Sequence, residues 1–189
     1  LERELESYSE LLGPLHIAGF DIGGGTPSFV PAEQIESLVR LAQQRFEFAP
    51  DMRISIETTP RIAAEEADKM RAYRQIGIER ISMGIQVIQP DLLRILNRDA
   101  HGVEHHFRAV ENIRAAGFDN FNVDLMYGFA NQSLESWQAT VEHALALDPE
   151  AITLYRMRYK LTRISDQADQ VTIDQVRILS RWAKRRLKE

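Results

Sequence analysis

The sequence predicts an α/β fold with a parallel sheet, either doubly wound or closed toward a barrel, and three observations favour the barrel. Short strand-like segments alternate with amphipathic stretches of about ten residues or more, which predicts a parallel sheet with right-handed crossovers. The strand candidates alternate apolar and polar residues, as expected where helices cover one face of a sheet and the other face lines a lumen. Residues 77–83 and 117–123 share a glycine helix stop followed by an alternating strand, which indicates a repeated unit.

The elements follow one another in a regular order along the 189 residues. Apolar residues at helical spacing predict helices over 1–12, 35–46, 103–113 and 134–145. Strands are expected at 15–22, 53–57, 80–86, 121–126 and 151–155. Pro31 and Pro60 stand where a first-turn proline belongs, and Thr172 opens a capping-box spacing before a last helix. We therefore divide the chain into a barrel core over residues 1–160 and a linker with a C-terminal helix over residues 161–189.

Polar side chains stand where the strand candidates end. Glu57, Gln86 and Asp124 each close an alternating strand, and the run Gly23–Gly25 follows the first strand. The carboxyl ends of barrel strands lie at one rim, so these groups are expected to converge. Each residue alone also has a purely structural explanation. Glu57 would cap the following helix, Gln86 would satisfy a buried loop, and Asp124 would stabilise a turn. Together, beside glycine backbone that a ligand can approach closely, they predict a binding pocket.

Composition limits the classes of protein to which the chain can belong. With 44% hydrophobic and 27% charged residues it is typical of a globular domain, and its apolar runs are far shorter than the roughly 20 residues of a membrane-spanning helix. A net charge of −5 argues against non-specific nucleic-acid binding, and we interpret Lys184–Arg186 as cations in the last turn of a helix. The chain has no cysteine, which excludes disulfides and thiolate-held clusters within these residues. We expect a cytoplasmic protein with no membrane span and no nucleic-acid partner.

Six segments of the chain match one known family in order and in spacing. They are Gly23–Ser28, Ile54–Pro60, Arg80–Gln86, Leu96–Arg98, Asn122–Gly128 and Ile152–Tyr155. Together they resemble the radical S-adenosylmethionine (SAM) enzymes related to oxygen-independent coproporphyrinogen III oxidase, over about residues 15–160. The resemblance implies a partial (β/α)6 barrel of the TIM type in which SAM ligates a [4Fe-4S] cluster and is cleaved reductively to a 5′-deoxyadenosyl radical.

By this resemblance, seven residues would contact SAM. They are Gly24, Gly25, Thr26, Glu57, Gln86, Arg98 and Asp124. The backbone of the first three would bind the methionyl end, and the glutamate would accept hydrogen bonds from a ribose. The last three match positions that contact a second SAM molecule in the coproporphyrinogen oxidases, where the arginine suits a carboxylate and the aspartate suits an ammonium or a hydroxyl pair. None of them is a proton-transfer catalyst, because the cofactors perform the difficult step and the protein positions them.

The sequence departs from the family pattern in one decisive place. The Cys-x3-Cys-x2-Cys loop that holds the cluster is absent, so the cluster ligands are expected upstream of Leu1. Residues 1–160 are then a radical SAM core that lacks its first strand and the cluster loop, and we expect this chain alone not to cleave SAM. His101, His105 and His106 have the spacing of a helical metal pair with a neighbour, but we interpret them as surface or capping histidines.

Three functions remain open. The first is a radical enzyme that acts on a tetrapyrrole, either a coproporphyrinogen oxidase or a haem-utilisation enzyme, with an electron donor as its partner. The second is a C-methyltransferase of the same family that acts on another aromatic substrate. The third is a haem-binding chaperone. The basic segment Tyr155–Lys160 could contact porphyrin propionates, but a solvated connection between a strand and a helix is the favoured interpretation.

Overall fold

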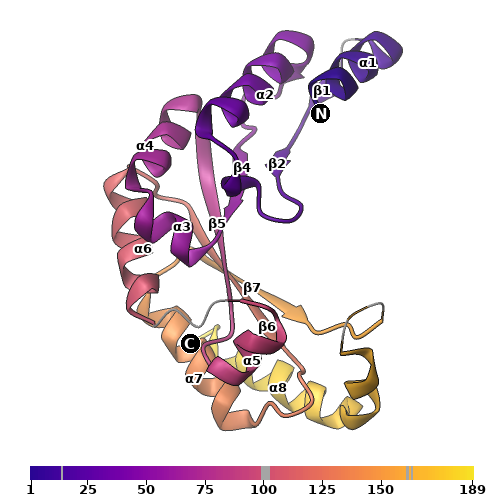
Figure 1. Ribbon diagram of the computed structural model, residues 1–189, viewed down its shortest axis with the longest axis vertical. Coiled ribbons are helices and arrows are strands. Elements are labelled where there is room, and N and C mark those ends of the chain that lie inside the picture. Colours follow the sequence, from indigo (N-terminus) through magenta and orange to yellow (C-terminus); the bar gives the residue numbers. More distant parts are fainter. Residues whose placement is uncertain (14, 99–102, 161, 163) are drawn as a thin grey trace.

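The described part of the chain is an open half-barrel of parallel strands that helices cover on one side (Figure 1). The computed structural model describes residues 1–13, 15–98, 103–160, 162 and 164–189. In chain order its elements are α1 (Glu2–Leu12), β1 (His16–Ile17), β2 (Phe20–Ile22), η1 (Pro27–Phe29), α2 (Ala32–Arg45), β3 (Glu47–Phe48), β4 (Ile54–Thr58), α3 (Pro60–Glu65), α4 (Ala67–Ile76), β5 (Ile78–Gln86), α5 (Pro90–Ile95), α6 (Glu104–Ala115), β6 (Phe121–Tyr127), α7 (Leu134–Ala146), β7 (Ala151–Arg156), η2 (Ser165–Gln170) and α8 (Ile173–Arg186).

The main sheet has five parallel strands in the order β2-β4-β5-β6-β7, which confirms the predicted α/β half-barrel. Four of the predicted strands are found within two residues of their expected bounds. The strand expected at 15–22 is wrong in detail, because it is two short strands. The first, β1, pairs with β3, and after a bend at residues 18–19 the second, β2, pairs with β4. The bend lets one segment exchange one partner strand for another.

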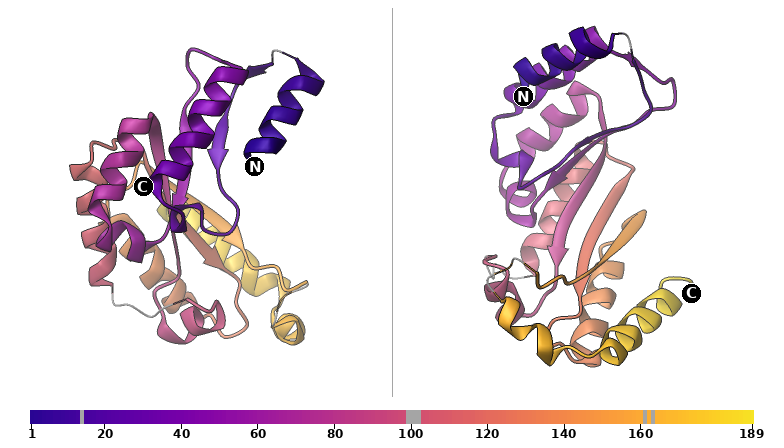
Figure 2. Two further views of the ribbon diagram at one scale, coloured as in Figure 1. Left: turned by 45° about the horizontal axis from the view of Figure 1, so that its top comes forward. Right: turned by 90° about the vertical axis from the view of Figure 1, so that its right-hand side faces the viewer.

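The alternation along the strands separates the core from the lumen. Ile56, Met83 and Val123 point to the helix-covered face and are fully buried, where they pack with Tyr73 of α4 and Trp137 of α7. The residues between them carry the hydroxyls and amides of the opposite face, which the helices leave open (Figure 2). The predicted division into an apolar and a polar face is therefore confirmed, and the polar face is free to form a site.

Helix boundaries follow the predicted caps with one exception. Pro60 is the first residue of α3. The Thr59 hydroxyl caps that helix by accepting a hydrogen bond from the backbone N–H of Ile62 at 3.3 Å. Thr172 caps α8 in the same way. Pro31 is wrong as a first-turn residue, because it stands at the N-cap with an extended backbone and α2 begins one residue later.

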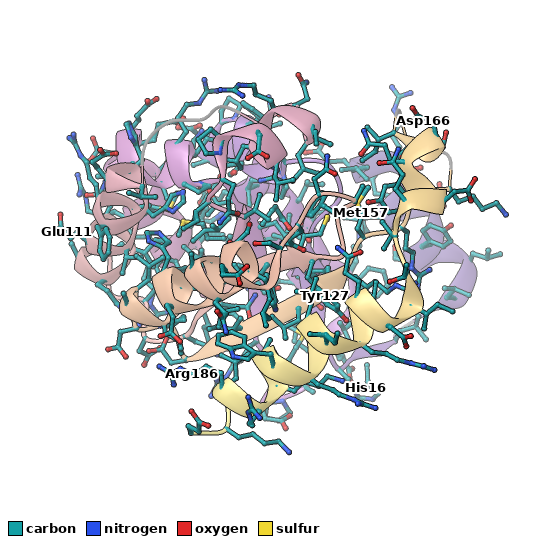
Figure 3. The ribbon with its side chains drawn as sticks, turned by 90° about the horizontal axis from the view of Figure 1, so that it is seen from below. His16, Glu111, Tyr127, Met157, Asp166 and Arg186 are labelled. Atoms are coloured by element: carbon teal, nitrogen blue, oxygen red, sulfur yellow. The ribbon has the colours of Figure 1, made fainter. Side chains whose placement is uncertain are left out.

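The last helix packs against the barrel. Trp137 is fully buried, and its indole Nε1–H donates to the carbonyl of Leu179 at 3.0 Å, which fastens α8 to α7. Figure 3 shows the two helices from below, with Arg186 near the C-terminal end of α8, where its guanidinium makes two hydrogen bonds to Glu142 at 2.6 and 2.9 Å. The basic run Lys184–Arg186 lies in the last turn of α8, as predicted. None of the helices in the described ranges is both long and apolar enough to cross a bilayer.

Candidate functional site

A cavity of about 280 Å³ lies at the carboxyl ends of β4, β5, β6 and β7, where the sequence places its candidate residues. Its walls are formed by Gly25, Thr26, Glu57, Thr58, Thr59, Ser82, Gly84, Gln86, Arg98, Asp124, Met126 and Tyr155. Six of the seven predicted residues are in this set, and Gly24 precedes them in the same turn without lining the cavity. A second cavity of about 520 Å³ adjoins it and shares Thr26, Thr59, Gly84 and Arg98. The structure therefore brings the predicted residues together.

The glycine run needs its glycines for two different reasons. Gly24 and Gly25 have φ angles of 87° and 69°, in the left-handed region that side chains rarely adopt, although a Cβ there would meet no atom within 4 Å. At Gly23 the limit is space, because a Cβ would stand 2.8 Å from Oε1 of Glu57. The turn therefore exposes its backbone to the cavity and lets the Glu57 carboxylate lie against it.

Strand β5 ends in a bulge that directs Gln86 into the cavity. The pairing with β6 shifts between Gly84 and Gln86, and Gln86 takes a φ of 69°, which is uncommon for a residue with a side chain. Its side chain is 9% exposed, and within the described residues its Oε1 is buried without a hydrogen-bond partner. Buried acceptors are normally paired, so this amide oxygen is available for a donor on a ligand.

Arg98 reaches the same place from the end of α5. Asn97 takes a left-handed φ of 52°, which ends the helix and turns the chain back toward the sheet. The Arg98 guanidinium then donates to the carbonyl oxygen of Gly84 at 2.8 Å. Burial lowers the pKa of Arg98 from its ordinary value and the negative charge of Asp124 partly offsets this, but an arginine stays protonated in proteins. Arg98 therefore presents a fixed positive charge.

The Asp124 carboxylate accepts hydrogen bonds from two polar side chains on the lumen face of the sheet. The Ser82 hydroxyl donates to its Oδ2 at 2.9 Å and the Asn122 amide donates to its Oδ1 at 2.8 Å. Tyr155, on the adjacent strand, is 49% exposed and its pKa is raised, first by the negative charge of Asp124 and then by burial and by Glu57. The phenol is therefore a hydrogen-bond donor at neutral pH.

Ser82, Asn122 and Tyr155 were not predicted as site residues. The strand alternation could have identified them, because each lies two positions from another residue on the polar face of its strand. Gly84 was missed as well. A Cβ on Gly84 would stand 2.8 Å from Nε2 of Gln86 and 3.3 Å from NH1 of Arg98, so the absence of a side chain makes room for both groups.

The donor set fits SAM and does not fit an iron–sulfur cluster. Two carboxylates, a guanidinium, an unpaired amide oxygen and exposed backbone suit a ligand that carries an ammonium, a carboxylate and ribose hydroxyls. A [4Fe-4S] cluster needs thiolate ligands, and none of the 189 residues is a cysteine. Within the described ranges no group of three His, Asp or Glu side chains could hold a metal ion.

The histidine prediction needs a correction at His106. This residue is 6% exposed rather than at the surface, and its Nδ1 lies 2.8 Å from Nε2 of His143, which joins α6 to α7. Burial, then the neighbouring His143 and His105, lower the pKa of His106 to about 4, and burial also lowers the pKa of His143. The two imidazoles are therefore uncharged at neutral pH, and their hydrogen bond links α6 to α7. His101 lies outside the described residues.

Comparisons with known proteins agree with the geometry. A family model described as Radical SAM superfamily matches residues 2–144. The chain is 32% identical over 168 residues to the oxygen-independent coproporphyrinogen III oxidase of Escherichia coli (strain K12), and 33% identical over 157 residues to the heme chaperone HemW of Haemophilus influenzae. The alignments cover 88% and 83% of this chain but only 36% and 40% of those relatives.

Solved structures show the same fold. The structure described as coproporphyrinogen III oxidase (HemN) from Escherichia coli superposes with a TM-score of 0.75 at 30% identity, over 92% of this chain and 39% of that one. The archaeal Methanocaldococcus infernus Elp3 superposes with a TM-score of 0.64 at 18% identity, over 89% of this chain and 44% of that one, which speaks for the fold alone. The resemblance inferred from the six sequence segments is thus confirmed.

Proposed function

The chain belongs to the radical SAM superfamily, and from that premise we propose that its strand-end cavity binds SAM and that the protein acts on a tetrapyrrole. One observation carries the binding proposal. Six residues that the family resemblance selects from five separate segments line a single cavity, and one of them, Gln86, holds a buried acceptor with no partner in the described residues. Such an atom is costly unless a ligand donates to it.

Each residue has a role that its geometry supports. The left-handed turn at Gly24 and Gly25, with Thr26 beside it, would bind the methionyl end of SAM through backbone groups. Glu57, packed on the glycine backbone, would accept the ribose hydroxyls. These residues together would form the first SAM subsite.

The remaining three residues would contact a second SAM molecule. Arg98 would pair with its carboxylate, because a guanidinium held at the Gly84 carbonyl by one N–H has further N–H donors in a planar arrangement that suits a carboxylate. Asp124 and the Gln86 amide oxygen would accept from its ammonium or hydroxyls. The adjoining cavity of about 520 Å³ gives additional room at Arg98.

The radical chemistry would come from the cofactors. SAM bound beside a reduced iron–sulfur cluster supplies a carbon-centred radical, and an external electron donor provides the reduction. This chain contributes no thiolate, so its own residues would bind and orient SAM and keep the lumen polar. We propose that residues 1–160 are this SAM-binding core, that residues 161–189 are a linker and C-terminal helix, and that the protein is cytoplasmic.

The names of two relatives support the proposed substrate class. One relative is named a coproporphyrinogen oxidase and another a heme chaperone, and both names refer to tetrapyrroles. We propose a radical enzyme that acts on a tetrapyrrole, and a haem-binding chaperone is the second candidate because of the similarity to HemW. A C-methyltransferase with another aromatic substrate remains the third.

The test uses the full-length product of the gene that encodes this sequence, after anaerobic reconstitution with iron and sulfide. A tetrapyrrole enzyme releases 5′-deoxyadenosine from SAM on reduction and consumes a porphyrinogen or haem. A chaperone binds haem in a titration and transfers it to an acceptor protein without changing it. Absence of 5′-deoxyadenosine under reducing conditions would overturn the enzyme proposal, and absence of haem transfer would overturn the chaperone.

A further inference from the structure

A chain of hydrogen bonds crosses three strands of the lumen beneath the candidate SAM site. The Thr153 hydroxyl on β7 donates to Oδ1 of Asn122 at 2.9 Å. The Asn122 amide on β6 donates to the Ser82 hydroxyl on β5 at 2.7 Å and to Oδ1 of Asp124 at 2.8 Å. The Ser82 hydroxyl donates in turn to Oδ2 of Asp124 at 2.9 Å. The chain therefore ends on both oxygens of one carboxylate.

The direction of these bonds is determined by the end groups. An ionised carboxylate has no proton and only accepts, so Ser82 must donate to Asp124 and must accept from Asn122. Both protons of the Asn122 amide are then in use, and its oxygen faces the hydroxyl of Thr153. Each member fixes the rotamer of the next one. Asn122 is 1% exposed and Ser82 is 7% exposed, and the hydrogen bond between them is buried.

The carboxylate keeps capacity for a ligand. Each oxygen accepts about two hydrogen bonds, and the lumen network supplies one to each. Asp124 lines the 280 Å³ cavity together with Gln86 and Arg98, so its remaining lone pairs can accept from a ligand there. Asp124 is thus anchored on its lumen side and available on its cavity side.

We propose that Ser82, Asn122 and Thr153 are positioning residues, which act on SAM binding through Asp124 by orienting its carboxylate toward the ammonium or hydroxyl groups of SAM. This role rests on the proposed function, since it takes Asp124 as a SAM contact. A serine and an asparagine at these positions supply donors that hold the carboxylate in one orientation before the ligand arrives. Preorganisation of this kind strengthens binding because the ligand does not have to order the side chain.

Ser55 provides a matched control on the neighbouring strand. It is also a lumen-facing serine that is 7% exposed, but its hydroxyl donates to Asp21 and not to Asp124. Replacement of either serine by alanine removes one buried hydroxyl from the same face of the sheet. Only Ser82→Ala removes a hydrogen bond from the carboxylate that faces the cavity.

The experiment measures SAM binding to this chain and to variants that form a double-mutant cycle. Isothermal titration calorimetry measures the affinity, and NMR replaces it where binding is weak. Ser82→Ala and Asn122→Ala are each expected to weaken SAM binding about two- to tenfold, the range for loss of one hydrogen bond. Ser82→Thr, which keeps the hydroxyl, is expected to restore binding, and Ser55→Ala is expected to bind as the wild type does. In an Asp124→Ala background, Ser82→Ala is expected to have no further effect, because its partner is gone. Circular dichroism confirms that each variant is folded.

The outcomes distinguish failure of the positioning role from failure of the SAM site. If the wild type binds SAM and the effect of Ser82→Ala persists in the Asp124→Ala background, the hydroxyl acts by another route and the positioning role is overturned while the SAM site stands. If Ser55→Ala weakens binding as much as Ser82→Ala does, the effect is general to the lumen and the role is overturned as well. If the wild type shows no binding at millimolar SAM, the proposed SAM site itself is overturned, and the positioning role with it.

Discussion

Replacement of Gly84 by alanine tests whether the bulged end of β5 arranges the cavity. An added Cβ would stand 2.8 Å from Nε2 of Gln86 and 3.3 Å from NH1 of Arg98, so the amide must move by about 0.6 Å to reach ordinary contact distance. Both atoms are the far ends of flexible side chains, and φ at Gly84 is not positive, so the strand itself tolerates alanine. We expect the change to disturb binding and to leave the fold intact.

The size of the effect follows from the bonds at stake. Displacement of the Arg98 guanidinium from the Gly84 carbonyl, where it now sits at 2.8 Å, misaligns one charge-assisted contact to the ligand. Hydrogen bonds to charged groups contribute about 1.5 to 3 kcal/mol, so SAM affinity should fall roughly 10- to 100-fold. The free energy of unfolding should change by less than about 1 kcal/mol.

The assay combines a SAM titration with urea unfolding, and Gly19→Ala is the matched control. Gly19 precedes β2, has no positive φ, and would place its Cβ more than 4 Å from other atoms. We expect it to bind SAM as the wild type does. Wild-type affinity in folded Gly84→Ala, or equal losses in both variants, would refute the role given to the bulge.

The remaining predictions concern other parts of the molecule. Gly23→Ala should push the Glu57 carboxylate away, since the new Cβ would stand 2.8 Å from its Oε1, and should weaken SAM binding about tenfold by titration; unchanged affinity would remove Glu57 from the site. The pKa of His106 lies at about 4, below its ordinary 6.5, so the unfolded chain binds the extra proton first, and stability should fall by up to about 3 kcal/mol between pH 6.5 and 4. In urea unfolding, a His106→Leu variant should lose less stability than the wild type between pH 6.5 and 4, by up to that amount, and an identical loss would refute the burial of an uncharged His106. Trp137→Phe removes the bond to α8 and should cost about 2 kcal/mol or more in urea unfolding, whereas Trp182→Phe, at a partly buried position, should cost less. Because the chain has no cysteine, chemical reconstitution should yield no 5′-deoxyadenosine from this chain alone, and its detection would contradict that expectation.

The strands and the polar rim were predictable because they depend on short-range periodicity. Alternation over residues 54–57 and 121–124 is enough to assign one face to the helices, and the end of each strand then fixes where Glu57 and Asp124 lie. The family motifs add Arg98, which no periodic pattern would select, since it follows a six-residue helix. The sequence therefore predicted that these candidate residues meet at one rim of the sheet, and the structure brings six of them to one cavity.

The rest depends on contacts between distant segments. The left-handed backbone of Gln86 arises from a bulge against β6, and neither strand encodes it alone. His106 meets His143 across 37 positions, so its burial was invisible to helical spacing and the surface interpretation was wrong. The break after β1 likewise reflects pairing with β3, a two-residue strand too short to have a pattern.

The central claim is that the glycine turn and the strand ends together bind SAM. The most direct measurement is an NMR titration of the isotope-labelled chain with SAM, which follows the backbone amides of Gly24, Gly25 and Thr26 and the side-chain amide of Gln86. We predict that both sets of signals shift and saturate, and that Arg98→Ala raises the dissociation constant obtained from the Gln86 signal. Signals that stay unchanged, or that shift only outside the residues lining the cavity, would contradict the claim.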